Sequence, residues 1–235
     1  MFRLLFTAAI IYLKRIIVLL SLLTPVFIQG SNGTKTTFQS IYEELKGNNK
    51  PEFVLFEKAY LGYIDLKLSG IIPSENHIFS IVDFRLPSTQ KRLWIIDLES
   101  KVILFNTYVA HGENSGKEYA LNFSNIENSH QSSLGYYLTE ETYIGKNGLS
   151  LKLKGLEYGI NHNARKRHIV FHGADYATKT YIDQNGILGN SEGCPAVPME
   201  LHQSIINLTK NGSCLFIYFP DNNYFENSQY YISDI

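Results

Sequence analysis

Apolar side chains recur along the chain in two different rhythms, and the first is helical. Residues 38–46 and 53–64 carry helix-like patterns, and in the second segment Phe53, Phe56 and Tyr60 fall at three- and four-residue steps. Pro51 stands close to the start of that segment, where the first turn of a helix accepts a proline. We therefore predict two helices that form an amino-terminal cap packed on a β-sheet.

From about residue 77 the rhythm changes to short runs rich in β-branched and aromatic side chains, which favour strands. Strands are predicted at residues 77–84, 93–97, 102–109, 134–144, 149–153, 168–172 and 213–219. Between the last two, Pro198 opens a predicted helix over residues 198–210, with Leu201 and Ile205 on one face. Many short strands with few helices indicate a mainly β or α+β fold.

The first thirty residues differ from the rest of the chain. Apolar stretches flank Lys14 and Arg15, and small residues follow near residue 30, as in a secretory signal peptide. An uncleaved membrane anchor is the alternative. In either case the remaining chain is predicted to lie outside the cytoplasm. The predicted order is a signal peptide or anchor at 1–30, a linker at 31–36, the helical cap at 37–76, the β-rich domain at 77–220 and a tail at 221–235.

Composition narrows the classes of function. A chain of 235 residues, 44% of them hydrophobic, suffices for one well-packed domain. The net charge of −1 argues against a nucleic-acid-binding protein, which usually shows a basic face. The only cysteines are Cys194 and Cys214, an even number that would allow a disulfide. Cys214 lies in an apolar strand pattern, however, and is predicted to be a buried core residue.

Cys194 is the first candidate for chemistry. It follows the turn-forming residues 188–193 and precedes Pro195, which disfavours helical geometry at the cysteine. Gly193 leaves room for a substrate to approach the backbone closely. These features suit a reactive thiol, and they equally suit an inert loop cysteine. Because Pro195 has no N–H, donors to a developing oxyanion must come from Cys194, Gly193 or a neighbouring side chain.

A base for this thiol is predicted among the histidines. His172 ends a predicted strand and precedes Gly173, so its imidazole can project into a cleft and lower the pKa of the thiol. His168, on the same face of that strand, and His111, at the end of another, are the rivals. A zinc site made of His111, His172, Asp175 and Glu192 is the competing use. However, the sequence has no Cys-x-x-Cys, and four residues along a strand separate His168 from His172 by roughly 13 Å, too far to share one ion. We therefore expect no metal.

The segment 111–131 joins two predicted strands and is long for a structureless connection. It is rich in glycine, asparagine, serine and glutamate, which keeps it solvated. Connections of this length are often functional lids. We predict that it flanks the site.

The cysteine and histidine segments together resemble the L,D-transpeptidase (YkuD-type) catalytic domain of bacterial murein enzymes. The family signature is a His-Gly pair at a strand end followed later by Ser-x-Gly-Cys. Here these segments read His172-Gly173 and Ser191-Glu192-Gly193-Cys194, and the subgroup's Cys-Pro-Ala-Val continuation is present at 194–197. A glycine-bearing strand at 132–137 also matches. Two positions depart from the pattern, because Glu192 stands where histidine is common and Ala196 where arginine is frequent.

The resemblance implies a β-sandwich-like catalytic domain at 77–220 and assigns roles within it. Cys194 would be the acyl-forming nucleophile and His172 the base, while Ser191 or a nearby backbone carbonyl would orient the imidazole. Gly193 and Cys194 would supply backbone donors to the oxyanion. Further predicted substrate contacts are His111, Gly173, Tyr136, Arg165 and Arg167. For the two arginines, an ordinary solvated basic cluster is the alternative.

The same resemblance implies an exported enzyme of the periplasm or cell envelope of a bacterium. It would act on peptidoglycan stem peptides and form 3-3 cross-links through a cysteine thioester, without a cofactor and with no nucleic-acid partner. Residues 1–30 would provide any association with the inner membrane. Two alternatives remain open at this point. One is an L,D-carboxypeptidase that uses water as the acceptor, and the other is a non-catalytic cell-wall-binding domain.

Overall fold

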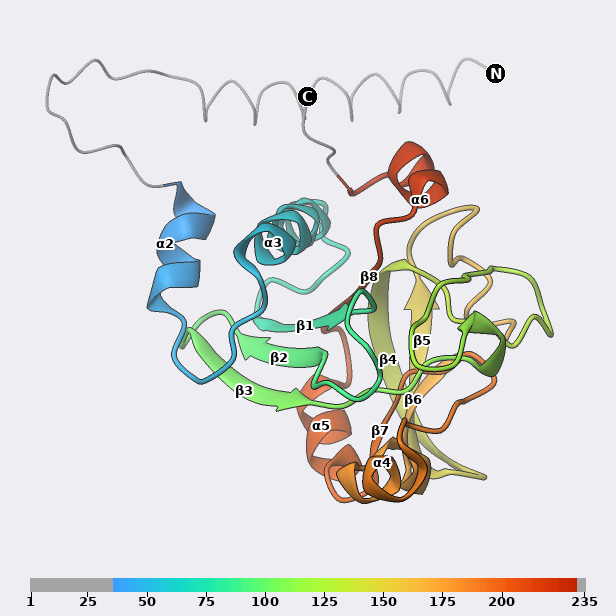
Figure 1. The fold of residues 1–235 in the computed structure, drawn as a ribbon. Helices are drawn as coiled ribbons and strands as arrows, with labels where there is room; N and C mark the ends of the chain where they lie inside the picture. The colour runs from blue at the N-terminus through green and yellow to red at the C-terminus, as the bar shows by residue number, and fades with distance from the viewer. Residues whose placement is uncertain (1–35, 232–235) are drawn as a thin grey trace, which may run out of the picture. The chain divides into compact units, whose positions relative to one another are not determined.

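One eight-stranded sheet organises the protein (Figure 1). The computed structural model describes residues 36–231. The strands are β1 (Ile78–Asp83), β2 (Leu93–Asp97), β3 (Val102–Thr107), β4 (Gly135–Gly145), β5 (Gly148–Gly155), β6 (Val170–Ala174), β7 (Ala196–Pro198) and β8 (Cys214–Tyr218). Their order is β3-β2-β1-β8-β4-β5-β6-β7, with β1–β8 and β6–β7 parallel and the other neighbours antiparallel. The predicted α+β fold is confirmed.

Helices pack on both sides of this sheet. They are α2 (Thr37–Glu44), α3 (Phe53–Leu68), α4 (Lys179–Asn185), α5 (His202–Thr209) and α6 (Asn222–Asn227), with two 3-10 turns, η1 (Glu113–Ser115) and η2 (Asp175–Ala177). The helix α3 lies on one side of β1 and α5 on the other (Figure 1). Both helices predicted before the sheet are present. Inside the predicted tail, α6 buries Tyr224 against the core.

Two predicted boundaries are wrong, and both lie near the candidate site. Residues 196–198 form β7 instead of opening the predicted helix, which begins only at His202. The strand predicted at 168–172 begins instead at Val170, because His168 has a left-handed backbone (φ 54°) and Ile169 donates its N–H to Ala164 in a turn. His172 therefore lies in the middle of β6 and not at its end. The other predicted strands are confirmed within a few residues.

The two edges of the sheet approach each other, so that it nearly closes into a barrel. The chain that leaves edge strand β3 reaches Ala110, whose N–H donates to the carbonyl of Ala196 in β7, the opposite edge strand, at 2.8 Å. One step further, Ser191 donates its N–H to His111 at 3.0 Å and accepts from Glu113 at 2.8 Å. We call this junction the seam. It holds residues 191–196 against residues 110–113.

The core fills the interior with aromatic and aliphatic side chains, and Cys214 is part of it. That thiol is fully buried in β8, as predicted, and neither cysteine forms a disulfide. The predicted signal peptide or anchor and nearly all of the predicted linker lie outside the described residues. Within residues 36–231, no helix is both long and apolar enough to cross a membrane.

Candidate active site

A tight turn carries the candidate nucleophile. The Ser191 hydroxyl donates to the Cys194 carbonyl at 2.6 Å and accepts the Gly193 N–H at 3.1 Å. Gly193 has φ +117°, and a side chain there would meet the Gln131 carbonyl oxygen at 2.8 Å, so only glycine fits. The turn thus fixes Cys194 at the seam, and it already engages the Gly193 N–H, one of the predicted oxyanion donors.

The Cys194 thiol lies against the backbone that leads into β6. Val170 donates its N–H to Sγ at 3.4 Å, and the thiol in turn faces the His168 carbonyl at 3.7 Å. Burial raises the pKa of Cys194, while the Val170 N–H and the positive charges of Arg167 and Lys146 act in the opposite direction. A sulfur that accepts a backbone N–H is better prepared to carry negative charge.

The imidazole of His172 is held in one orientation by its own strand. Its Nδ1–H donates to the carbonyl of Gly173 at 3.0 Å. A carbonyl only accepts, so the neutral ring carries its proton on Nδ1 and leaves Nε2 as an acceptor. Burial lowers the pKa of His172, and the charges of Lys146 and His202 add to this effect. A backbone carbonyl therefore orients the ring, whereas the Ser191 hydroxyl shapes the cysteine turn.

Strand pairing brings the histidine and cysteine segments together. His172 pairs with Ala196 in parallel register, and its N–H donates to the Pro195 carbonyl at 3.4 Å. Cys194 lies in the turn two residues before Ala196, the first residue of β7. Among residues 36–231, no hydrogen bond joins the thiol to the imidazole. Catalytic hydrogen bonds are often long without substrate, so this geometry is compatible with a nucleophile and its base.

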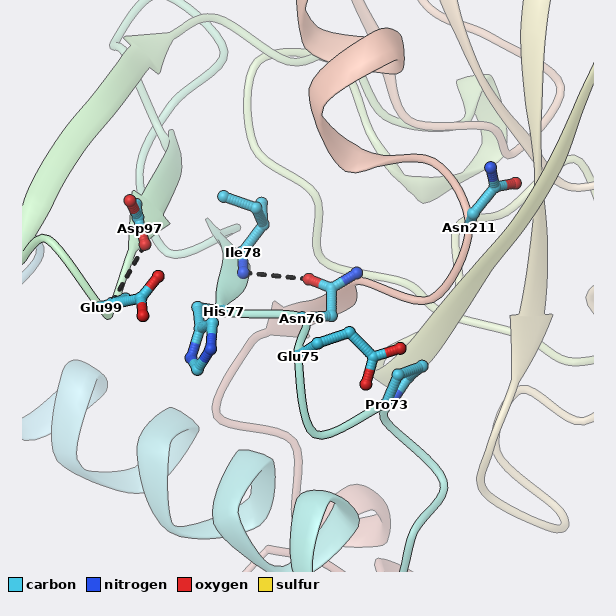
Figure 2. A pocket seen from close by; sticks show the side chains of 8 residues that line it. All are labelled: Pro73, Glu75, Asn76, His77, Ile78, Asp97, Glu99 and Asn211. Atoms are coloured by element: carbon cyan, nitrogen blue, oxygen red, sulfur yellow. Dashed lines mark hydrogen bonds between the residues drawn. The ribbon is translucent and has the colours of Figure 1, made fainter.

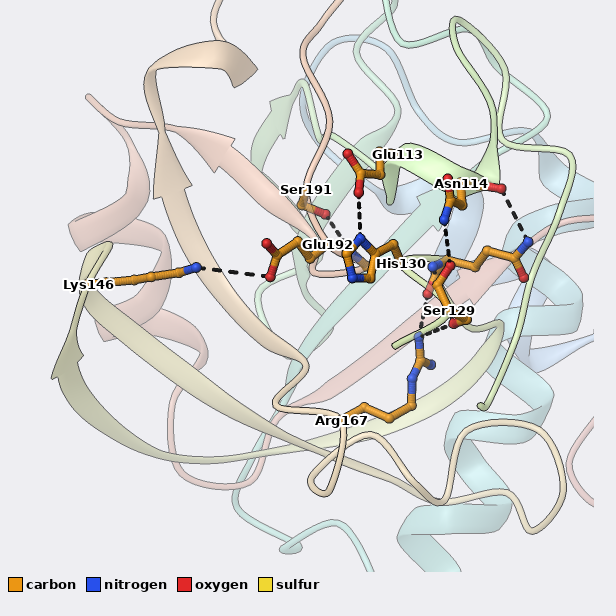
Figure 3. Close-up of polar contacts among 10 residues, drawn as sticks. Glu113, Asn114, Ser129, His130, Lys146, Arg167, Ser191 and Glu192 are labelled. Carbon is orange, nitrogen blue, oxygen red and sulfur yellow. Dashed lines mark hydrogen bonds and ion pairs between the residues drawn. The ribbon is translucent and has the colours of Figure 1, made fainter. Parts of the chain in front are cut away.

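The predicted lid, residues 111–131, flanks the cysteine turn and is tied down by Arg167. That guanidinium donates to the Ser124 carbonyl at 2.6 Å, to the Ser129 hydroxyl at 3.1 Å and to the Gln131 carbonyl at 2.5 Å. Figure 3 shows Arg167 reaching Ser129 and, nearby, His130 paired with Glu113. The loop is thus a fixed wall beside Cys194 in this structure.

Two residues that were predicted to contact the substrate, His111 and Tyr136, are fully buried instead. His111 has no exposed surface, and both of its ring nitrogens are engaged, by Arg92 at 2.7 Å and by the Gly116 carbonyl at 3.1 Å. Tyr136 is equally buried, and its hydroxyl donates to the carbonyls of helix α3. Neither side chain can touch a substrate from these positions.

The arginines and Gly173 also have roles of their own. Arg167 uses its guanidinium on the lid and on the Ser133 hydroxyl at 2.6 Å, which leaves it poorly placed to bind a substrate carboxylate. Arg165 is exposed and forms an ion pair with Glu140 on the surface. Gly173 lies against the His202 ring and lines the pocket beside the site.

That pocket, of about 590 Å³, adds side chains that the sequence did not single out. It is lined by Lys146, Asn147, Gly148, Leu149, Gly173, Ala174, Asp175, Tyr176, Met199, His202 and Gln203. Lys146, at the turn between β4 and β5, points toward Glu192 across 4.0 Å (Figure 3). Neither Lys146 nor Tyr176 belongs to a recognisable motif, so spacing alone offered no signal for them.

A second pocket, of about 310 Å³, lies elsewhere. Residues from the start of β1, the end of β2 and the loop before β8 line it, among them His77, Asp97 and Asn211 (Figure 2). None of the residues predicted for the site borders it. Of the predicted site residues, only Gly173 lines the 590 Å³ pocket, so the candidate chemistry gathers at the cysteine turn and β6.

Comparison with known proteins bears on the catalytic domain as a whole. The family model for the L,D-transpeptidase catalytic domain matches residues 47–218. The chain belongs to this family. Members are cysteine L,D-transpeptidases, and the family acts on peptidoglycan. No curated protein matches the chain in sequence.

Solved structures of other proteins are similar to this chain only at low identity. An L,D-transpeptidase from Mycobacterium smegmatis is 8% identical over 61% of this chain and 59% of its own, with a TM-score of 0.39. L,D-transpeptidase 3 from Mycobacterium tuberculosis is 9% identical over 61% of each chain (TM-score 0.38). The Bd1075 protein of Bdellovibrio bacteriovorus is 16% identical over 61% of this chain and 48% of its own (TM-score 0.38). The match therefore spans about half to three-fifths of these solved chains.

Proposed function

We propose that this protein is an exported cysteine acyltransferase that joins peptidoglycan stem peptides by 3-3 cross-links. One observation carries the proposal. At the seam, a partly exposed thiol lies beside the strand of a neutral imidazole whose Nδ1 proton is fixed on a backbone carbonyl. A nucleophile, a base and a group that orients the base are the parts that covalent acyl transfer requires.

The first step would form a thioester. The S–H bond of Cys194 turns from the His168 carbonyl toward His172, and Nε2 takes the proton as Sγ attacks the carbonyl of the third residue of a tetrapeptide stem. The bond to the terminal D-alanine breaks, and the imidazolium returns the proton to the leaving amine. In the second step an amine of another stem attacks the thioester, its proton passes to His172, and the thiolate leaves.

The acceptor of the acyl group, an amine or water, distinguishes an L,D-transpeptidase from an L,D-carboxypeptidase. Incubation with a disaccharide-tetrapeptide, followed by mass spectrometry, is expected to give a cross-linked dimer and free D-alanine. Tripeptide without dimer identifies the L,D-carboxypeptidase alternative. Cys194→Ala should abolish both products, whereas Cys214→Ala, which removes the buried thiol of β8, should keep them. A folded wild-type enzyme that releases no D-alanine contradicts the proposal and favours a wall-binding domain.

The location is a separate part of the proposal. We propose that residues 1–30 direct the chain out of the cytoplasm, either as a cleaved signal or as an anchor. Expression in a bacterium with a carboxy-terminal tag, followed by fractionation and amino-terminal sequencing of the tagged chain, tests this. A shortened chain in the envelope fraction indicates cleavage, and a full-length chain in the membrane indicates an anchor. Full-length protein confined to the cytoplasm contradicts export.

A further inference from the structure

Arg167 holds the second half of the lid and its continuation with both terminal nitrogens of its guanidinium. One nitrogen donates to the Ser124 carbonyl and to the Ser133 hydroxyl, each at 2.6 Å. The other donates to the Ser129 hydroxyl at 3.1 Å and to the Gln131 carbonyl at 2.5 Å (Figure 3). Four acceptors thus converge on one planar cation. A guanidinium suits this arrangement because its donors have a fixed fork geometry, which the single ammonium of a lysine lacks.

The segment that Arg167 holds lies against the cysteine turn. A Cβ at Gly193 would lie 2.8 Å from the Gln131 carbonyl oxygen and 3.4 Å from the Arg167 guanidinium. The next residue, Ser132, is buried, and its hydroxyl donates to the Gly193 carbonyl at 3.3 Å. The same hydroxyl accepts the N–H of Gly112 at 3.1 Å, so it joins the lid to the seam. Displacing this segment would therefore remove the surface on which Gly193 rests.

Gly193 depends on support from outside the turn because glycine restricts the backbone least. Its φ of +117° lies in the region that favours glycine. The Ser191 hydroxyl holds the Gly193 N–H from within the turn, and the Ser132 hydroxyl holds the Gly193 carbonyl from the lid. That carbonyl belongs to the peptide group that leads into Cys194. Its orientation therefore sets the direction in which the cysteine side chain leaves the turn.

Arg167 also links this lid segment to the strand of the candidate base. Apart from Arg167 and Gly193, the hydrogen-bond partners of residues 129–132 lie within residues 112–131 of the lid itself, as far as the structure describes the chain. Arg167 stands three residues before Val170, the first residue of β6, whose N–H donates to the thiol sulfur. The stretch that begins at Arg167 thus reaches the thiol through its backbone, and it reaches the cysteine turn through the Arg167 side chain and the lid.

We propose that Arg167 is a positioning residue for the nucleophile, because its guanidinium holds the lid against Gly193 and thereby fixes the turn that carries Cys194. It touches no substrate and transfers no proton. Its positive charge also lowers the pKa of the Cys194 thiol, so a test must separate the charge from the fork. The inference rests on Cys194 as the nucleophile of the proposed function, but it does not depend on peptidoglycan as the substrate.

The experiment compares two reactions of the same thiol in variants that differ in charge and in shape. Arg167→Lys keeps the charge and loses the fork, and Arg167→Met loses both. Acylation by p-nitrophenyl acetate is followed by p-nitrophenolate release, and alkylation of Cys194 by iodoacetamide is followed at the same pH. Both reactions require the thiolate, so the ratio of their rates cancels a change in its ionisation. Only acylation also requires the turn and the base to be aligned.

We expect the ratio of acylation to alkylation to fall roughly 10²-fold in both Arg167→Lys and Arg167→Met, because a small displacement of a reacting group has an effect of that order. Amide hydrogen exchange at residues 129–132 should become faster in the same two variants. Lys166→Met, which removes a neighbouring cation from an exposed ion pair, is the matched control and should change neither quantity. Ser132→Ala, which removes the contact between the lid and the turn but keeps Arg167, should also lower the ratio.

The outcomes separate this inference from the proposed function. A wild-type ratio in Arg167→Lys overturns it, because the charge alone would then suffice, and so does unchanged hydrogen exchange. Equal falls of both rates in Arg167→Met, with the ratio unchanged, overturn it as well and assign Arg167 to ionisation of the thiol. A wild-type thiol that is alkylated but never acylated also contradicts it. If Arg167→Met does not fold, Arg167→Lys and Ser132→Ala decide.

The peptidoglycan substrate is tested independently of this role. An enzyme that releases no D-alanine from a tetrapeptide, yet shows an Arg167-dependent ratio of acylation to alkylation, refutes the peptidoglycan proposal and leaves the positioning role intact. An enzyme that releases D-alanine at the same rate in wild type and Arg167→Lys supports the proposed function and refutes the positioning role.

Discussion

Two buried histidines lie near the seam, and the difference between them separates structure from candidate chemistry. His111 is fully buried and His172 is only 3% exposed, and burial lowers the pKa of both, to about 4 for His111. His111 has both ring nitrogens engaged, by Arg92 and by the Gly116 carbonyl. Within residues 36–231, the His172 ring makes a hydrogen bond through Nδ1 only. The comparison teaches that a free ring nitrogen, and not burial or a shifted pKa, marks the candidate base.

The largest effect should come from removing that free nitrogen. His172→Gln deletes the base, and we expect Cys194 acylation to fall about 10²- to 10⁴-fold, as is usual for the loss of a general base. The rate of p-nitrophenolate release measures this. His111→Gln, corrected for the fraction of folded protein, is the matched control and should acylate at a rate close to that of wild type. Equal losses in both variants would erase the distinction between the two histidines.

Substitutions around His111 should instead change the free energy of unfolding. Arg92 is fully buried and donates to the carbonyls of Val109 and Leu86 as well as to His111. Arg92→Met leaves these acceptors without a partner, so we expect the free energy of unfolding to fall by about 4 kcal/mol. Urea denaturation measures the change. Arg165→Met, at an exposed ion pair, should cost less than about 1 kcal/mol. A stable Arg92→Met protein would show that the seam tolerates unpaired carbonyls.

Lowering the pH should reduce the free energy of unfolding through the same buried histidine, His111. Burial, then the charge of Arg92, lowers the pKa of His111 to about 4. The unfolded chain therefore binds this proton below about pH 6.5, whereas the folded protein binds it only below about pH 4. Stability is complete above pH 6.5 and should fall by up to roughly 3 kcal/mol as the pH drops toward 4. Urea titrations between pH 7 and pH 4 should give a shallower dependence for His111→Gln, and an identical slope argues against this linkage.

The smallest expected effect concerns the positive charge of Lys146, which lines the 590 Å³ pocket. Burial raises the pKa of the Cys194 thiol, and the positive charge of Lys146 is among the effects that lower it. Lys146→Gln should therefore move the pH profile of thiol alkylation upward and slow alkylation at pH 7 by no more than about fivefold, because an exposed charge is well screened. Lys166→Gln, at another exposed ion pair, serves as the control. Faster alkylation of Cys194 in Lys146→Gln than in wild type would contradict the prediction that Lys146 lowers the pKa of the thiol.

Most of the fold could be predicted from local sequence patterns, because the positions of strands and helices depend on the spacing of apolar side chains along the chain. The signature around His172 and Cys194 could also be read directly, since its residues are few and close in sequence. His111 misled because a histidine after a strand looks the same whether it faces a cleft or a buried arginine. Arg167 misled similarly, since its basic neighbours suggested a surface patch while its guanidinium folds inward onto the lid. These differences are set by tertiary contacts between distant segments.

The seam has a consequence for the order in which the protein assembles. Ala110 and Ala196 pair across a wide separation in sequence, and contacts of that kind form late because they close long loops. Ser191 of the cysteine turn is hydrogen-bonded across the same junction, so the turn reaches its final position against residues 111–113 only when the two sheet edges meet. A nascent or partly folded chain therefore carries the thiol without its oriented surroundings. Reactivity becomes a property of the finished fold, and acylation kinetics during refolding would report the final closure of the barrel.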